Sequence, residues 1–178
     1  MDKVVWRRWA EALAPTGPEE SERIVAVLRR RLAEESWRVI LTFLAMPGEV
    51  DLSALHSAPG VRFLVTRTPA QGPLTVHELR DDLEEHRFGF RQPRAETPVV
   101  DPAEADAILV PGVLFDHRGG RLGHGRGYYD GLLTGLTSGP TKVGVTVDRR
   151  VVEKLPMGPD DVFMDALVTE TGWKEVER

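Results

Sequence analysis

The stretch 121–133, RLGHGRGYYDGLL, holds four glycines, two arginines, a histidine and an aspartate within thirteen residues. Glycines let backbone N–H groups approach an oxygen anion, and the amino end of a following helix adds positive potential. Arg121 and Arg126 could bind phosphate or carboxylate by charge-assisted hydrogen bonds, and Asp130 could hold a Mg²⁺ that shares phosphate oxygens. The Walker A pattern and the dinucleotide fingerprint are both absent, so the loop alone also fits a plain turn into a helix.

To bind an anion in this way, the loop must follow a strand and lead into a helix. Residues 107–116 supply a buried strand and a second apolar stretch, and residues 127–133 can begin a helix. Similar apolar runs, typical of strands buried on both faces, occupy 38–45, 61–66, 142–147 and 166–170. An alternating run at 74–79 favours an edge strand, and the Pro-rich stretch 91–106 is interpreted as a connector.

Two helices are expected ahead of the first strand. Residues 2–13 place Trp6, Trp9, Ala10 and Leu13 at helical spacing. The second helix starts within 16–20 and carries an apolar stripe of Ile24, Val27, Leu28 and Leu32. Helices alternating with buried strands predict a three-layer α/β/α fold with an open, mostly parallel, Rossmann-like sheet. Ligands are then expected beyond the carboxyl ends of the strands.

Length and composition restrict the classes of protein that fit. The 178 residues suit one domain spanning 1–178, and the chain has no cysteine, which excludes disulfides and thiolate metal sites. The chain contains no apolar run long enough to span a membrane and no secretory signal, so a cytoplasmic location is predicted. A net charge of −5 argues against a nucleic-acid partner, although 19 arginines leave room for a local basic site.

Residues 110–133, VPGVLFDHRGGRLGHGRGYYDGLL, resemble the signature of the 5-formyltetrahydrofolate cyclo-ligase family, in outline PG-x-x-F-D followed by R-L-G-x-G-x-G-Y-Y-D. The resemblance extends over almost the whole chain. Residues 3–7 resemble its K-x-x-L-R, and 43–52 its strand followed by E-V-D-T. Residues 88–93 resemble its G-I-x-E-P connector, and 142–172 its closing block.

The resemblance implies an activity and two ligands. Members of the family use ATP and Mg²⁺ to convert 5-formyltetrahydrofolate into 5,10-methenyltetrahydrofolate, releasing ADP and phosphate. Transfer of the γ-phosphoryl group to the formyl oxygen gives an imidate phosphate, which N10 of the folate attacks. Such a reaction needs alignment of two anions and neutralisation of charge more than a nucleophilic side chain. The implied partner is a small-molecule folate, with ATP as co-substrate and no nucleic acid or membrane.

The family's site residues carry over onto matching positions. The implied catalytic residues are Arg121, Arg126 and Tyr129. The implied ATP-binding residues are Lys3, Arg7, Arg121, Gly123, Gly125, Arg126, Gly127, Tyr128 and Tyr129. Folate binding would fall to Met46, Glu49, Asp51, His124 and Tyr128, and Mg²⁺ binding to Asp130 and Asp165. Taken without the family, Lys3 and Arg7 also fit a solvated helix face, Glu49 a surface loop, and His124 a side chain with no role.

Several positions depart from the family pattern. Leu52 replaces a usual threonine and Gln92 a common glutamate, while Arg149 or Arg150 stands where a glutamine is usual. Residues 158–161 replace E-x-H-D but keep Asp161. These changes fall more on the folate side than on the ATP side. An alternative is therefore a non-catalytic or substrate-altered relative that binds nucleotide, folate or both.

Overall fold

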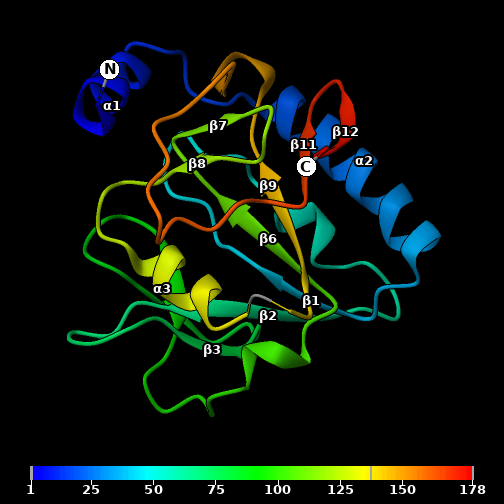
Figure 1. Cartoon of the computed structure of the whole chain (residues 1–178). Helices are drawn as coiled ribbons and strands as arrows, with labels where there is room; N and C mark the ends of the chain where they lie inside the picture. The colour runs from blue at the N-terminus through cyan, green and yellow to red at the C-terminus, as the bar shows by residue number, and fades with distance from the viewer. Residues whose placement is uncertain (1, 137, 178) are drawn as a thin grey trace.

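The computed structural model describes residues 2–136 and 138–177 and is built around a seven-stranded sheet in the order β12-β11-β9-β6-β1-β2-β3 (Figure 1). The five strands from β11 to β2 are parallel, and β12 and β3 pair antiparallel at the two edges. The strands are β1 Val39–Thr42, β2 Arg62–Arg67, β3 Thr75–Glu78, β6 Ala107–Pro111, β9 Thr141–Val145, β11 Ala166–Thr169 and β12 Gly172–Glu175. The predicted α/β fold with a mostly parallel sheet is confirmed.

The two N-terminal helices begin where local signals place them. Helix α1, Lys3–Glu11, starts after Asp2, whose carboxylate accepts hydrogen bonds from the Val4 and Val5 amides. Helix α2, Pro18–Glu35, has proline at its first position, and Glu20 accepts a hydrogen bond from the Gly17 amide. Of the apolar residues that the sequence places at helical spacing here, Ala10 is fully buried in α1, whereas the Trp9 side chain is 44% exposed.

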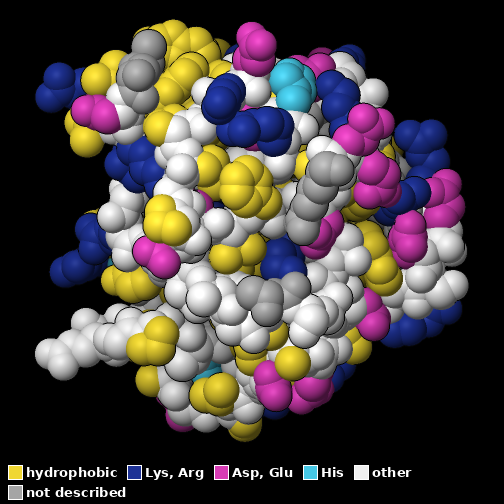
Figure 2. All heavy atoms as spheres, viewed as in Figure 1, with side chains coloured by type: hydrophobic (Ala, Val, Ile, Leu, Met, Phe, Trp, Pro, Cys, Tyr) yellow, Lys and Arg dark blue, Asp and Glu magenta, His cyan; other side chains and the backbone are white. Residues whose placement is uncertain are grey.

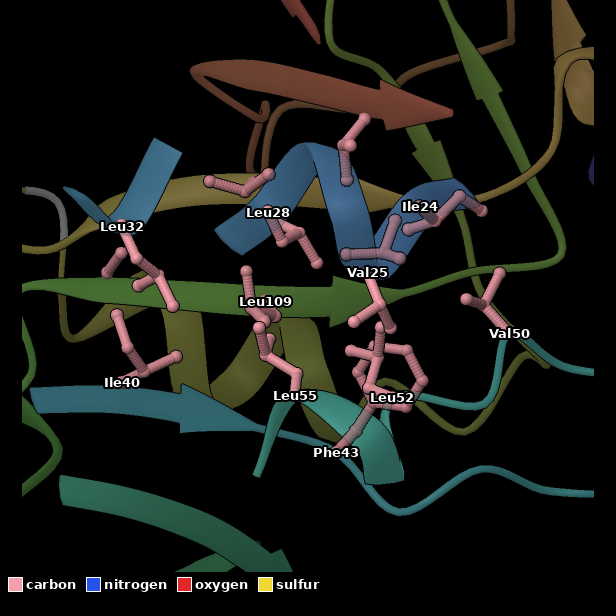
Figure 3. Close-up of a cluster of buried hydrophobic side chains, with 14 of the residues drawn as sticks. Ile24, Val25, Leu28, Leu32, Ile40, Phe43, Val50, Leu52, Leu55 and Leu109 are labelled. Carbon is pink, nitrogen blue, oxygen red and sulfur yellow. The ribbon is translucent and has the colours of Figure 1, made fainter. Parts of the chain in front are cut away.

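Each face of the sheet is covered by a different layer, as Figure 1 shows for α2 and for α3, Tyr128–Thr134. Ile24, Val25, Leu28 and Leu32 of α2 pack on one face against side chains such as Ile40 and Leu109 (Figure 3). Leu133 of α3 packs on the other face with residues such as Leu41, Ile108 and Leu167. The three-layer prediction is therefore confirmed. On the α2 side of the molecule, acidic and basic side chains are interspersed at the surface (Figure 2).

Smaller elements complete the fold. A three-stranded sheet joins β10 Val151–Val152, β7 Leu114–Asp116 and β8 Arg121–Leu122, and a hairpin joins β4 Leu83–Glu85 to β5 Arg91–Pro93. The 3₁₀ turns are η1 Ser53–Leu55, η2 Pro102–Glu104 and η3 Asp148–Arg150. The interpretation of 91–106 as a plain connector is wrong at both ends, since it contains β5 and η2. None of the helices in the described ranges is long and apolar enough to cross a membrane.

Candidate active site

A cavity of about 580 Å³ lies at the carboxyl ends of β1, β2 and β6. The N-terminal helix, the glycine-rich loop and the β4–β5 hairpin form its other walls. The sequence-predicted residues that line it are Lys3, Arg7, Met46, Glu49, Arg121, Gly123, His124, Gly125, Arg126, Gly127, Tyr128, Tyr129 and Asp130. The fold thus brings most of the predicted site residues to one place, at the sheet edge where ligands of parallel α/β proteins gather.

The glycine-rich loop depends on glycine at two positions. Gly125 has φ +96° and Gly127 has φ +70°, in the left-handed region that other residues rarely adopt. A Cβ atom on Gly125 would lie 3.2 Å from the guanidinium carbon of Arg7. The loop can therefore turn tightly into α3 while the N-terminal helix approaches it closely.

Arg121 is a buried cation held in a fixed place. Its side chain is 4% exposed, donates to the Pro111 carbonyl over 3.1 Å and pairs with Asp130 over 3.2 Å. Its Nε is buried and has no hydrogen-bond partner among the described residues. A buried donor without a partner is costly in a protein interior, so Arg121 holds its place at a cost in folding free energy.

Tyr129 is partly buried and lies next to Arg121. The guanidinium carbon of Arg121 lies 5.5 Å from the Tyr129 ring centre, and the hydroxyl is 3.5 Å from that of Thr66. Burial raises the pKa of Tyr129 to about 12, so the phenol stays protonated at neutral pH. This side chain can donate a hydrogen bond but is not a base under ordinary conditions.

Two of the three cations of α1, Lys3 and Arg7, reach the cavity. Arg7 donates from Nε to the Gly123 carbonyl over 2.8 Å. Lys3 pairs over 2.5 Å with Asp161, which also accepts from the Gly158 amide over 2.6 Å. Burial acts to raise the pKa of Asp161, but the hydrogen bonds from Lys3 and Gly158 outweigh it and leave the pKa below its usual value. Lys3 and Arg7 therefore lie on a cavity wall rather than on a free solvated face.

Another part of the cavity wall combines one carboxylate with aromatic rings. Glu49 accepts from the Met46 amide over 2.9 Å, and its other oxygen lies 3.6 Å from Nε2 of His124. Phe88 and Phe90 come from the β4–β5 hairpin and were not among the site residues predicted from the sequence. Arg126 stacks over Phe88 with 4.9 Å between the guanidinium carbon and the ring centre. The alternation of aromatic residues in FGFRQP is the signal that could have identified this wall.

Two predicted site residues lie elsewhere. Asp51 accepts a hydrogen bond from the amide of Ser53, the first residue of η1, over 2.9 Å, and it lines a neighbouring cavity instead. Asp165 precedes β11 at the amino edge of the sheet, where its carboxylate accepts from the Lys142 amide over 2.8 Å. Because the cavity is at the carboxyl edge, Asp165 is not among its lining residues and does not share it with Asp130. Within the described ranges, no three histidine or acidic side chains cluster as a metal site.

The fold and the cavity define an α/β protein with a glycine-rich, cation-lined ligand site at the carboxyl edge of its sheet. The model of the 5-formyltetrahydrofolate cyclo-ligase family matches residues 10–170. The chain belongs to this family and is an enzyme of the ligase class.

Named relatives agree with this assignment. A 5-formyltetrahydrofolate cyclo-ligase of Saccharomyces cerevisiae is 40% identical over 86% of this chain and 85% of its own. A probable 5-formyltetrahydrofolate cyclo-ligase of Schizosaccharomyces pombe is 33% identical, and the match covers 53% of this chain and about half, 52%, of that protein. The NMR structure of the 5,10-methenyltetrahydrofolate synthetase of Aquifex aeolicus superposes with a TM-score of 0.75 at 31% identity, over 89% of this chain and 81% of that one.

Proposed function

We propose that this protein uses ATP and Mg²⁺ to cyclise 5-formyltetrahydrofolate to 5,10-methenyltetrahydrofolate, with release of ADP and phosphate through an imidate phosphate on the formyl group. The observation that carries the proposal is Arg121, a buried guanidinium with an unpartnered Nε beside the glycine-rich loop. A buried cation held in a fixed place stabilises the charge that develops during phosphoryl transfer without having to reorganise.

The side chains that line the cavity would have different roles in binding and catalysis. Lys3 and Arg7 would neutralise phosphate oxygens from α1, while Arg126 extends from the loop beside Phe88. Tyr129 would donate a hydrogen bond, because its phenol is protonated. Glu49, already oriented by the Met46 amide, would accept hydrogen bonds from the N–H edge of the pterin. The aromatic wall suits a flat folate ring.

Asp130 fits the role of a Mg²⁺ ligand. Its carboxylate is 31% exposed, lines the cavity and stands in the first turn of α3 next to Arg121. Mg²⁺ in nucleotide sites commonly takes one or two protein carboxylates and completes its shell with phosphate oxygens and water. When bound, the ion supplies charge neutralisation to the phosphates. Asp165, at the other edge of the sheet, does not support this role as placed.

The departures from the family pattern mostly occupy structural positions, which favours the cyclo-ligase over a substrate-altered relative. Leu52 is buried in the core under α2. Gln92 accepts from the Thr68 amide and so links the hairpin to the end of β2. Arg149 pairs with Glu20 and donates to the Pro15 carbonyl, which fixes the connection between α1 and α2. None of these three side chains lines the cavity.

The test is absorbance in the methenyl-folate band after mixing protein, Mg²⁺-ATP and 5-formyltetrahydrofolate. Growth of the band should need both ATP and Mg²⁺. It should fall at least a hundredfold in Arg121→Gln, because about 3 kcal/mol of transition-state stabilisation is lost. Arg30→Gln removes the same charge from the exposed face of α2 and should keep full activity.

Either of two outcomes would contradict the proposal. Full activity in Arg121→Gln would remove the buried guanidinium from the mechanism. Binding of ATP and folate by calorimetry without growth of the band would identify a non-catalytic member. The cytoplasmic location and the absence of a nucleic-acid partner, both expected from the sequence, stay predictions.

A further inference from the structure

A second cavity, of about 440 Å³, adjoins the first. Arg7, Glu49 and His124 border both cavities, so the two meet at these side chains. The second cavity extends to Thr146 at the carboxyl end of β9 and to Arg150 at the end of η3. Apart from the three shared residues, no residue that lines the second cavity was assigned to a ligand by the family resemblance.

Arg150 is a partly buried cation that lacks an ion-pair partner. Its Nη1 donates to the Val113 carbonyl over 3.2 Å, and no carboxylate within the described ranges lies within ion-pair distance. Burial, with a smaller effect from Arg149, lowers the pKa of Arg150, and Glu49 only partly opposes this. The preceding Arg149 differs, because it pairs with Glu20 and is accounted for structurally.

Arg7, at the junction of the two cavities, also lacks an ion-pair partner among the described residues. It donates to the Gly123 carbonyl and forms no ion pair with the acidic residues that the structure describes. Two carboxylates also line the second cavity. Glu49 is engaged by the Met46 amide and His124, and Glu11 is exposed on α1. Two guanidiniums that bond to backbone carbonyls but have no ion-pair partner among the described residues, one at the junction and one inside, make this cavity suited to an anion.

We propose that the second cavity binds part of the nucleotide's phosphate chain, with Arg150 donating to its oxygens and Arg7 bridging to the glycine-rich loop. The inference rests on the proposed function and adds a binding residue to it. A phosphate chain carries charge along its length, so one end can lie at the loop while another satisfies Arg150. The carboxylates of the folate's glutamate portion have the same anionic chemistry and are the other source to distinguish.

The test is calorimetric titration of Arg150→Gln with Mg²⁺-ATP and, separately, with 5-formyltetrahydrofolate. ATP affinity should fall about tenfold, the effect of losing one charge-assisted hydrogen bond, while folate affinity stays unchanged. Arg150→Lys keeps the charge without the forked geometry of the guanidinium. Its ATP affinity should lie between those of the wild type and Arg150→Gln. Arg8→Gln is the matched control, since it removes an exposed arginine next to Arg7 that lines neither cavity.

The outcomes separate the inference from the function on which it rests. Wild-type ATP affinity in both Arg150 variants would overturn the inference and leave the proposed function standing. A loss of folate affinity instead of ATP affinity would assign the cavity to the folate carboxylates and also overturn it. A wild-type protein that binds folate but no ATP would refute the proposed function itself.

Discussion

Asp116 is a fully buried carboxylate. Its replacement by asparagine should lower the free energy of unfolding. It lies at the end of β7 and is 0% exposed. One oxygen accepts from the amides of Arg118 and Gly120 over 3.0 and 2.7 Å, and the other from the Leu155 amide over 2.8 Å. The carboxylate therefore joins the β7–β8 turn, which leads into Arg121, to the loop after β10.

The cost of Asp116→Asn follows from these bonds. Asparagine can keep its oxygen toward Arg118 and Gly120, but its amide group then faces the Leu155 N–H, donor against donor. Leaving a buried amide unsatisfied costs about 1–3 kcal/mol. The two remaining bonds lose their charge assistance, about 0.5–1 kcal/mol each, and the lower desolvation of a neutral side chain offsets part of this. The expected loss of unfolding free energy is about 2–4 kcal/mol.

Urea unfolding followed by tryptophan fluorescence measures this loss. With an m-value of about 2 kcal/mol per molar urea, the midpoint should fall by about 1–2 M at unchanged slope. Asp101→Asn is the control, because this exposed carboxylate caps η2 through the Ala103 amide and asparagine caps equally well. A midpoint for Asp116→Asn within about 0.3 M of this control would refute the reasoning.

Three further changes have definite expected outcomes. Gly125→Ala should weaken ATP binding about tenfold in a calorimetric titration, because the left-handed turn is strained and the new methyl group displaces the α1 arginine. Burial lowers the pKa of His56 to about 4, so stability should fall as pH drops from about 6.5, where the unfolded histidine takes up its proton, toward 4; an NMR titration of the ring gives the midpoint. The hydrogen bond from Arg149 lowers the pKa of Glu20, so the pair stabilises fully above pH 4.5 and loses this effect as pH falls through the lowered value. In Arg149→Gln, unfolding midpoints at several acidic pH values should lack this part of the acid dependence.

Each of these expectations has a result that would contradict it. Gly60→Ala is the control for Gly125→Ala, since Gly60 also has a positive φ, +74°, but open space around its Cβ position. Equal loss of ATP affinity in both would point to general strain. A ring titration of His56 near 6.5 would contradict its burial. For Arg149→Gln, a difference from wild type that stays constant with pH would show that the pair does not titrate as described.

The strands of the parallel sheet were predictable because each is a short, continuously apolar run, and this pattern requires cover on both faces. Hairpins were harder to predict. Strand β12 is half exposed and carries Trp173 and Lys174 without a clear period, and β4 reads LEE. These strands form because a neighbour offers free backbone groups, which is a tertiary cause that a local pattern does not contain.

Some features of the candidate site could likewise be predicted from the local sequence, and others depend on the fold. The glycine-rich loop was predictable because its residue types, spacing and flanking elements lie within one stretch of chain. The residues that contact this loop and the N-terminal helix could not be predicted from the sequence. Asp161 lies 158 positions from Lys3, and Phe88 meets Arg126 only through the fold. Asp165 was misplaced because matching motifs align residues along the chain but do not say which edge of the sheet they occupy.

Helix α1 also bears on the order in which the molecule can be built. Its contacts are with elements far along the chain, because Arg7 bonds to Gly123, Trp6 and Leu13 pack in a cluster with Leu122 and Leu155, and Lys3 meets Asp161. During synthesis on a ribosome, this helix leaves the exit tunnel long before any of those partners exists. It must remain undocked, with its tryptophans accessible to chaperones, until the last loop emerges.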